Sequence, residues 1–185
     1  MHAQMGVYET AIAPTKSRVF DALLGPGGGG GGDSQARPPL RLLEPFCREA
    51  AAAAGLGEGQ LTLVQGSAEA MPFGDGAFDA AVITLVLCSV PDPAAALSEV
   101  RRVVAPGGRL ALIEHVAAAP AARPLVALGQ RLLDPLQGLV ADGCHLTRDT
   151  GRLLEVQGYD TAGVESFDVD GLGILAPHIA GVIQL

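Results

Sequence analysis

The residues of this sequence that could bind a ligand stand directly after short apolar runs. The runs at 40–43, 61–64, 78–87 and 109–116 have the aliphatic, β-branched composition of strands. Open parallel sheets bind their ligands where the strands end. The residues at those ends include Glu44, Gly66, Ser67, Ala68, Glu69, Thr84, Leu85, Glu114 and His115. Their order predicts a pocket that takes a small polar ligand through backbone amides and a few side chains.

These strand-like runs alternate with helical patterns, which is typical of a doubly wound α/β domain. Helices are predicted at 8–24, 47–54, 94–104, 125–140 and 151–158, and two further strands at 163–167 and 178–183. The run 78–87 is apolar almost throughout, so we expect it inside a parallel sheet, beside 109–116. The last two strands are expected to form an antiparallel pair.

A glycine-rich segment divides the chain. Gly27–Gly32 is a run of six glycines within the Gly- and Pro-rich stretch 25–39. Phosphate-binding loops follow a strand and open a helix, whereas this run follows a predicted helix and precedes a strand. We interpret 25–39 as a flexible linker. It separates an N-terminal helix at 1–24 from a single domain at 40–185.

Composition excludes several classes of protein. The 185 residues are 49% hydrophobic and 17% charged, which is enough apolar material for a core. The net charge of −8 makes nucleic-acid binding a poor assignment, because that function needs clustered Lys and Arg. The longest apolar stretch is well short of the roughly 20 residues that span a membrane, and the first residues lack a signal-peptide pattern. We therefore expect a soluble, cytoplasmic protein.

The cysteines give no sign of a metal site. Cys47, Cys88 and Cys144 are far apart and match no zinc or C-x-x-C spacing. Free thiols in a reducing compartment are the expected state. We predict no metal ligands in this chain.

Three segments resemble class I S-adenosylmethionine-dependent methyltransferases of the type 11 domain. They are 64–73 (VQGSAEAMPF), 76–79 (GAFD) and 95–115, which includes Pro106-Gly107-Gly108-Arg109. The resemblance implies a Rossmann-like sheet that is reduced at its N-terminal edge and has an antiparallel last strand. It also implies S-adenosylmethionine as the cofactor and a small-molecule methyl acceptor.

Further segments are similar to one branch of that family, the animal methyltransferase-like thiol S-methyltransferases with their plant and algal relatives. These segments are 84–90 (TLVLCSV), 114–118, 133–135, 142–148 (DGCHLTR) and 177–181. The resemblance implies a lipophilic thiol as acceptor. It places Gly66, Ser67, Ala68 and Glu69 on the adenine side of the cofactor and Thr84 and Leu85 beneath it. The substrate-side candidates that it implies are His115, Asp142, His145 and Arg148.

The sequence departs from this family after its first strand. Family members carry a glycine-rich loop there, and an acidic residue about twenty positions later binds the ribose. Here Glu44 runs directly into Pro45, so a loop, a helix and a strand are missing. Glu44 matches either the acid of the glycine motif or the ribose-binding acid. The alternative to an active enzyme is therefore an inactive methyltransferase remnant that acts at most as a binding module.

Overall fold

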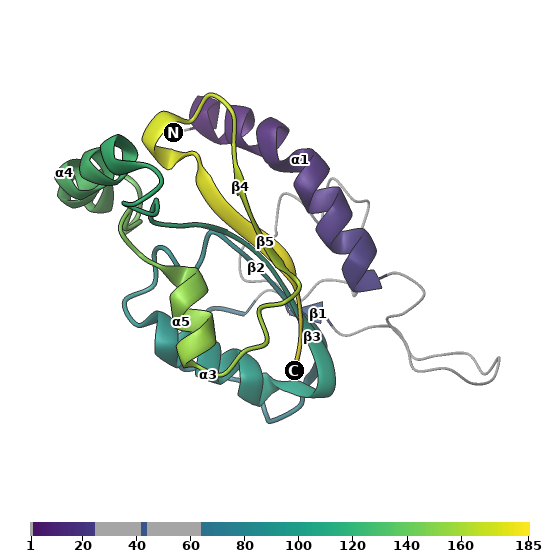
Figure 1. The fold of residues 1–185 in the computed structure, drawn as a ribbon. Helices are drawn as coiled ribbons and strands as arrows, with labels where there is room; N and C mark the ends of the chain where they lie inside the picture. The colour runs from purple at the N-terminus through teal and green to yellow at the C-terminus, as the bar shows by residue number, and fades with distance from the viewer. Residues whose placement is uncertain (1, 25–41, 44–63) are drawn as a thin grey trace.

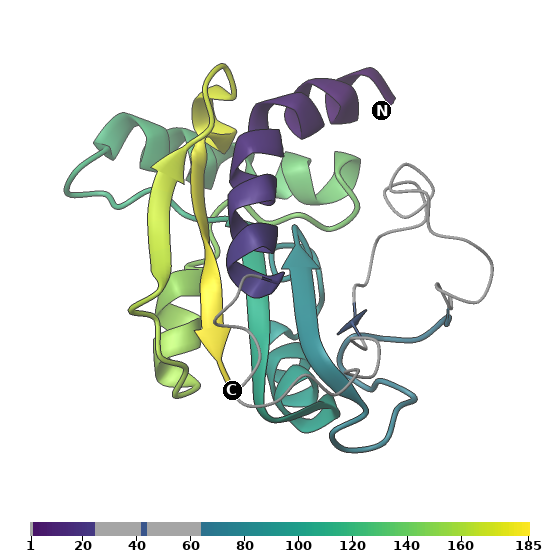
Figure 2. The ribbon, with the colours of Figure 1, turned by 90° about the vertical axis from the view of Figure 1, so that its right-hand side faces the viewer.

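One mixed sheet forms the centre of the molecule. The computed structural model describes residues 2–24, 42–43 and 64–185, and the strands in these residues are ordered β1-β2-β3-β5-β4. The strands are β1 (Leu42–Leu43), β2 (Phe78–Thr84), β3 (Val104–His115), β4 (Val164–Asp168) and β5 (Pro177–Gln184). β1, β2 and β3 are parallel, and β5 runs antiparallel to both β3 and β4 (Figure 2). The predicted pairing of 78–87 with 109–116 and the antiparallel final pair are confirmed.

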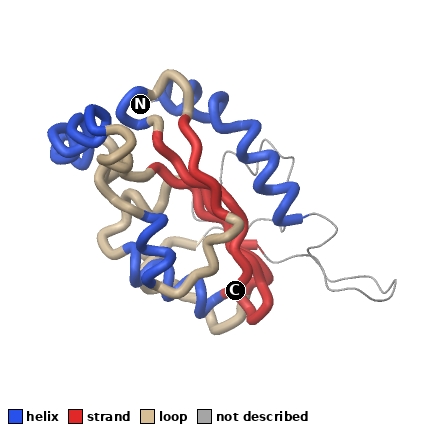
Figure 3. Tube along the Cα trace, in the orientation of Figure 1, coloured by secondary structure: helices blue, strands red, loops and turns tan. Residues whose placement is uncertain are grey.

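Helices cover both faces of this sheet (Figures 1 and 3). The helices are α1 (His2–Leu24), α3 (Pro93–Val103), α4 (Pro124–Val140) and α5 (Thr150–Val156), with a short 3-10 helix, η1 (Gly173–Leu175). On one face, Val19 and Leu23 of α1 pack against Val82 and Ala111 of the sheet. On the other face, α3 and α5 enclose the larger core. The strands therefore alternate their apolar side chains between two cores.

The N-terminus of α3 fixes the chain at the end of β2. Asp92 precedes the helix, and its carboxylate accepts the backbone N–H groups of Ala94 and Ala95, each at 3.0 Å. Pro93 occupies the first helical turn, where its missing N–H costs no hydrogen bond. Leu97 and Val100 then bury the helix against the core. This cap sets where the chain leaves the carboxyl edge of the sheet.

Some predicted boundaries were wrong. The strand predicted at 109–116 begins at Val104, so the helix before it ends at Val103 and Pro106-Gly107-Gly108 lies within the strand. The strand can pass this point because residue 108 is a glycine. A Cβ there would come within 2.7 Å of the Asp79 carbonyl oxygen. The strand predicted at 78–87 ends earlier, at Thr84. The predicted linker 25–39, the helix 47–54, Glu44 and most of the strand at 61–64 lie outside the described residues.

Candidate functional site

The carboxyl edge of the sheet is organised around the turn that follows β2, residues 85–92. Leu85 has a left-handed φ of 55°, which ends the strand after Thr84. Its backbone N–H donates to the carbonyl of Ile113 in β3 at 3.0 Å. A leucine in this backbone region is strained, and such residues persist only where neighbours fix them. The surrounding contacts show what holds this turn in place.

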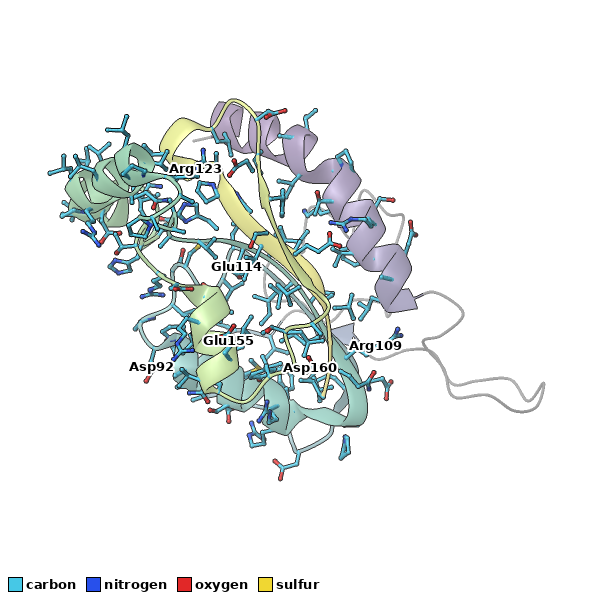
Figure 4. All side chains as sticks on the ribbon, in the orientation of Figure 1. Asp92, Arg109, Glu114, Arg123, Glu155 and Asp160 are labelled. Atoms are coloured by element: carbon cyan, nitrogen blue, oxygen red, sulfur yellow. The ribbon has the colours of Figure 1, made fainter. Side chains whose placement is uncertain are left out.

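The buried carboxylate of Glu114 supports the turn from the end of β3. It accepts the backbone N–H groups of Val86 at 2.8 Å, Leu87 at 3.1 Å and Cys88 at 3.3 Å. Glu114, which is labelled in Figure 4, has no exposed surface. One side chain therefore binds three successive amides, which would otherwise be buried without partners.

Burial also shifts the ionisation of this carboxyl group. Removal from water raises the pKa of Glu114 to about 8, and the neighbouring Cys88 thiol adds to the increase. The three amide donors act in the opposite direction, because they stabilise the charged form. The charge of Glu114 consequently changes near neutral pH.

Glu69 connects the predicted adenine-side loop to the same turn. Its Oε1 accepts the backbone N–H of Asp92 at 3.2 Å, and its Oε2 accepts the hydroxyl of Ser67. These hydrogen bonds lower the pKa of Glu69. Ala68 packs against the core, and a Cβ at Gly66 would meet the Pro72 ring at 3.1 Å. The structure therefore brings residues 66–69 to the carboxyl edge of β2.

Arg148 and His145 also contact the turn. The Arg148 guanidinium donates to the carbonyl oxygens of Leu87 and Val90, both at 2.6 Å. The backbone N–H of His145 donates to the Cys88 carbonyl at 2.8 Å. Nη1 of Arg148 therefore links the loop at 142–148 to the backbone of the turn, and the predicted substrate-side role of Arg148 stays a prediction.

The loop that carries these residues is tied to α4 through Asp134. This carboxylate accepts the backbone N–H groups of Leu146 at 2.5 Å and Thr147 at 3.1 Å, and it lies 3.3 Å from Nδ1 of His145. Asp142, with a φ of 49°, is exposed at the start of the same loop. Residues 142–148 therefore lie against the turn after β2, together with the adenine-side loop.

Thr84 has an unusual environment for a hydroxyl group. Its Oγ1 is buried and makes no hydrogen bond among the described residues. Buried hydroxyls nearly always have a partner, and leaving one without costs about 1–3 kcal/mol. The atom lies at the carboxyl end of β2, where this type of sheet binds ligands. This position suits a donor or acceptor that comes from a bound molecule.

His115 lies apart from this cluster. Alternation along β3 puts its ring on the opposite face of the sheet from Glu114, edge-to-face with His178 at a centroid distance of 5.6 Å. Neither ring nitrogen has a hydrogen-bond partner among the described residues. Burial lowers the pKa of His115 to about 4, with a further decrease caused by His178, so the ring is neutral at pH 7. Its predicted substrate-side role remains a prediction.

A partly open cavity of about 420 Å³ adjoins the carboxyl end of β3. Its wall is mixed: apolar side chains follow β3 and come from β5, and polar side chains come from α4, from β4 and from the loop before α5. Its lining includes Val116, Ala118, Gln130, Arg131, Thr147 and Ile179. A second hollow, of about 440 Å³, is lined by Asp75, Gly76 and Pro106. It lies at the amino end of β3, away from the edge where open parallel sheets bind ligands.

Glu114 was expected only as a residue at a strand end, and its role as an acceptor for backbone amides was not predicted. The available signal was an acidic residue that closes a buried apolar strand, Leu110–Ile113 being fully buried in the structure. A carboxylate at such a position requires partners, because burial of an isolated charge is costly. The partners could not be read from the sequence because they are backbone amides of another strand's loop.

The sheet and the helices that cover it match a known fold. The fold matches that of a SAM-dependent methyltransferase from Thermotoga maritima, with a TM-score of 0.52 and 18% identity over 80% of this chain and 83% of that one. Residues 42–112 match the methyltransferase domain family. The Rossmann-like fold of S-adenosylmethionine-dependent methyltransferases is therefore confirmed.

Two of the relatives are thiol S-methyltransferases. One from Rattus norvegicus is 47% identical over 81 residues, which cover 44% of this chain and 32% of that protein. One from Homo sapiens is 38% identical over 108 residues, which cover 58% of this chain and 43% of that protein. The matches thus span less than half the length of these two relatives. The predicted resemblance to thiol S-methyltransferases is confirmed.

Proposed function

We propose that this chain binds S-adenosylmethionine at the carboxyl edge of β1 and β2 and transfers its methyl group to a small acceptor, a lipophilic thiol. The family match and the names of the relatives support methyl transfer. The observation that carries the proposal is the buried hydroxyl of Thr84 at the end of β2, which has no hydrogen-bond partner among the described residues. A ligand atom at this edge would satisfy it.

The described part of the edge fits such a cofactor. Glu114 fixes the amides of residues 86–88, so the turn is formed before any ligand arrives. Glu69 holds residues 66–69 beside this turn. A preformed site loses less conformational entropy on binding than a flexible one. Thr84 and the backbone of Leu85 are the groups that we propose contact the cofactor.

The chemistry requires little from acidic or basic side chains. When bound, S-adenosylmethionine supplies a methyl group activated by a positively charged sulfur. The acceptor thiol loses its proton to solvent; its sulfur then bonds to the methyl carbon while the old carbon–sulfur bond breaks and leaves its electron pair on the departing sulfur. The protein's task is to hold these groups in line, which can supply most of the rate. The cavity beside β3, whose wall includes the apolar side chains of Val116, Ala118 and Ile179, has room for a small lipophilic acceptor.

The alternative is a remnant that folds without binding the cofactor. The observation that favours it is the direct passage from Glu44 to Pro45, where relatives have a glycine-rich loop. Glycines there allow the backbone to approach the cofactor closely. Both of the assignments that we considered for Glu44 remain predictions.

Calorimetric titration with S-adenosylhomocysteine separates these two proposals. We expect micromolar binding by the chain and about 2- to 12-fold weaker binding by Thr84→Val, as for one lost hydrogen bond. Thr161→Val, just before β4 at the opposite edge of the sheet, is the matched control and should bind like the original chain. Absence of heat at millimolar ligand would identify the chain as a remnant. Equal affinity of Thr84→Val and Thr161→Val would remove Thr84 from the site.

A further inference from the structure

The α4 helix is oriented with its polar side inward. Its buried and half-buried side includes Ala127, Gln130 and Asp134. The Gln130 amide is fully buried: its Oε1 accepts the Ala118 N–H at 2.7 Å, and its Nε2 donates to the Ile174 carbonyl at 3.0 Å. Polar contacts therefore attach α4 to the loop after β3 and to η1, and its leucines lie on the exposed side.

That exposed side carries a continuous row of leucines. We call it the α4 leucine stripe: Leu125, Leu128, Leu132, Leu136 and Leu139, with 82%, 54%, 71%, 56% and 85% of their surface exposed. At 3.6 residues per turn the five side chains fall within an arc of roughly 80°. Figure 1 shows α4 at the periphery of the molecule. A surface helix of a monomer normally exposes its polar side to solvent. We therefore expect a partner to cover this stripe.

The spacing of the stripe identifies the partner. Leu125 and Leu139 are equidistant in sequence from Leu132, and so are Leu128 and Leu136. A row that reads the same from both ends is self-complementary when two copies pack antiparallel about a two-fold axis at Leu132. Such an interface, in which one patch contacts its own copy, is the usual form in homodimers. We propose that a second copy of this chain covers the α4 leucine stripe, with α4 packed antiparallel on its symmetry mate.

Area and charge favour a second copy over a membrane surface. The stripe exposes on the order of 600 Å², near the upper limit for a monomer's largest apolar patch and close to the roughly 800 Å² that each partner buries in a standard interface. Helices that lie on membranes carry many Lys and Arg on their polar side. Residues 124–140 contain one basic residue, Arg131, in a chain of net charge −8.

Sedimentation equilibrium of the whole chain, from about 1 to about 100 μM, tests the proposal. We expect a monomer–dimer equilibrium, and a dimer at least about tenfold weaker for Leu132→Glu, because the axis would bring two carboxylates together. Val156→Glu is the matched control. This exposed apolar residue of α5 lies outside the stripe, so the variant should dimerise like the original chain. Circular dichroism verifies that each variant folds.

A charge pair tests the antiparallel register itself. Leu128→Glu and Leu136→Arg should each weaken the dimer, whereas the double variant should regain most of the lost affinity, because residue 128 faces residue 136 of the other copy. A chain that stays monomeric at 100 μM, or a Leu132→Glu variant that dimerises normally, would overturn the proposal. A monomer that binds phosphatidylcholine vesicles through the stripe would also overturn it and would identify a membrane surface as the partner.

Discussion

Oε1 of Glu114 lies 2.8 Å from the backbone nitrogen of Val86 and 3.1 Å from that of Leu87. This contact links the end of β3 to the turn after β2, where the ligand of such a sheet is expected. It also explains how Leu85 maintains its left-handed conformation. The geometry of the proposed cofactor site therefore depends on one buried carboxyl group.

Removal of that carboxyl group should destabilise the fold strongly. Glu114→Ala leaves three buried amides without an acceptor, and we expect the free energy of unfolding to fall by about 3 kcal/mol or more. Urea denaturation measures the change. Glu155→Ala, an exposed substitution on α5, should cost less than about 0.5 kcal/mol. Equal effects of the two substitutions would show that Glu114 does not support the turn.

The raised pKa of Glu114 predicts a particular pH dependence of stability. Its folded pKa of about 8 lies above the ordinary 4.5, so the folded state holds the proton more tightly than the unfolded state. The resulting stabilisation is complete below pH 4.5 and is lost as pH rises toward 8, by at most about 1.4 kcal/mol per pH unit. Glu114→Gln has no such proton and should lack this decline.

The informative range for that comparison is pH 6.5 to 8. His115, whose folded pKa of about 4 lies below its ordinary 6.5, acts in the opposite direction and only below about pH 6.5. Urea denaturation of the original chain and of Glu114→Gln at several pH values in this range isolates the Glu114 contribution. Parallel curves for the two proteins would contradict the assigned pKa.

Thr84→Val should separate stability from ligand binding. Valine matches the shape of threonine and removes a buried hydroxyl that has no partner in the described structure. We expect the ligand-free protein to become more stable by up to about 1–3 kcal/mol, while affinity for S-adenosylhomocysteine falls. Thermal unfolding with and without this ligand measures both effects. A variant that loses stability without ligand would show that the hydroxyl has a structural partner.

Arg148→Ala should loosen the turn after β2. It removes charged hydrogen bonds to the carbonyls of Leu87 and Val90 and should cost about 1.5–3 kcal/mol. Arg152→Ala, at an exposed position four residues later, should have little effect. Hydrogen exchange at residues 86–90 should accelerate in Arg148→Ala alone; unchanged exchange there would mean that Arg148 does not position the turn.

The sequence predicts the sheet well and the orientation of some elements poorly. The apolar run 78–87 and the run from Leu110 onward indicated adjacent buried strands, because such patterns suit a parallel sheet and little else. Helical periodicity at 125–140 predicted α4, but the usual rule would turn its leucines inward. Gln130 and Asp134 face inward instead, because they accept hydrogen bonds from backbone groups of neighbouring loops. The sequence pattern does not show where those loops lie, so this orientation could not be predicted.

The sequence predicts only part of the candidate site. Strand ends can be recognised in a sequence, so Thr84 and Glu69 were identified and lie at one edge of the sheet. Whether a given side chain bonds to the protein or faces a ligand depends on three-dimensional contacts, which the sequence does not show. The bonds from the Arg148 guanidinium to the Leu87 and Val90 carbonyls could not be predicted from the sequence, and its substrate-side role stays a prediction. No helix within the described residues is long and apolar enough to cross a membrane.

The central claim is that S-adenosylmethionine binds at the carboxyl edge of β2, and amide spectra test it most directly. Titration of the ¹⁵N-labelled chain with S-adenosylhomocysteine should shift the signals of residues 66–69 and 84–89. The amides of Asp160 and Gly163, at the opposite edge of the sheet, should keep their positions. Saturable shifts confined to residues 66–69 and 84–89 are the predicted result. Unchanged spectra at millimolar ligand, or shifts centred on residues 160–163, would contradict the claim.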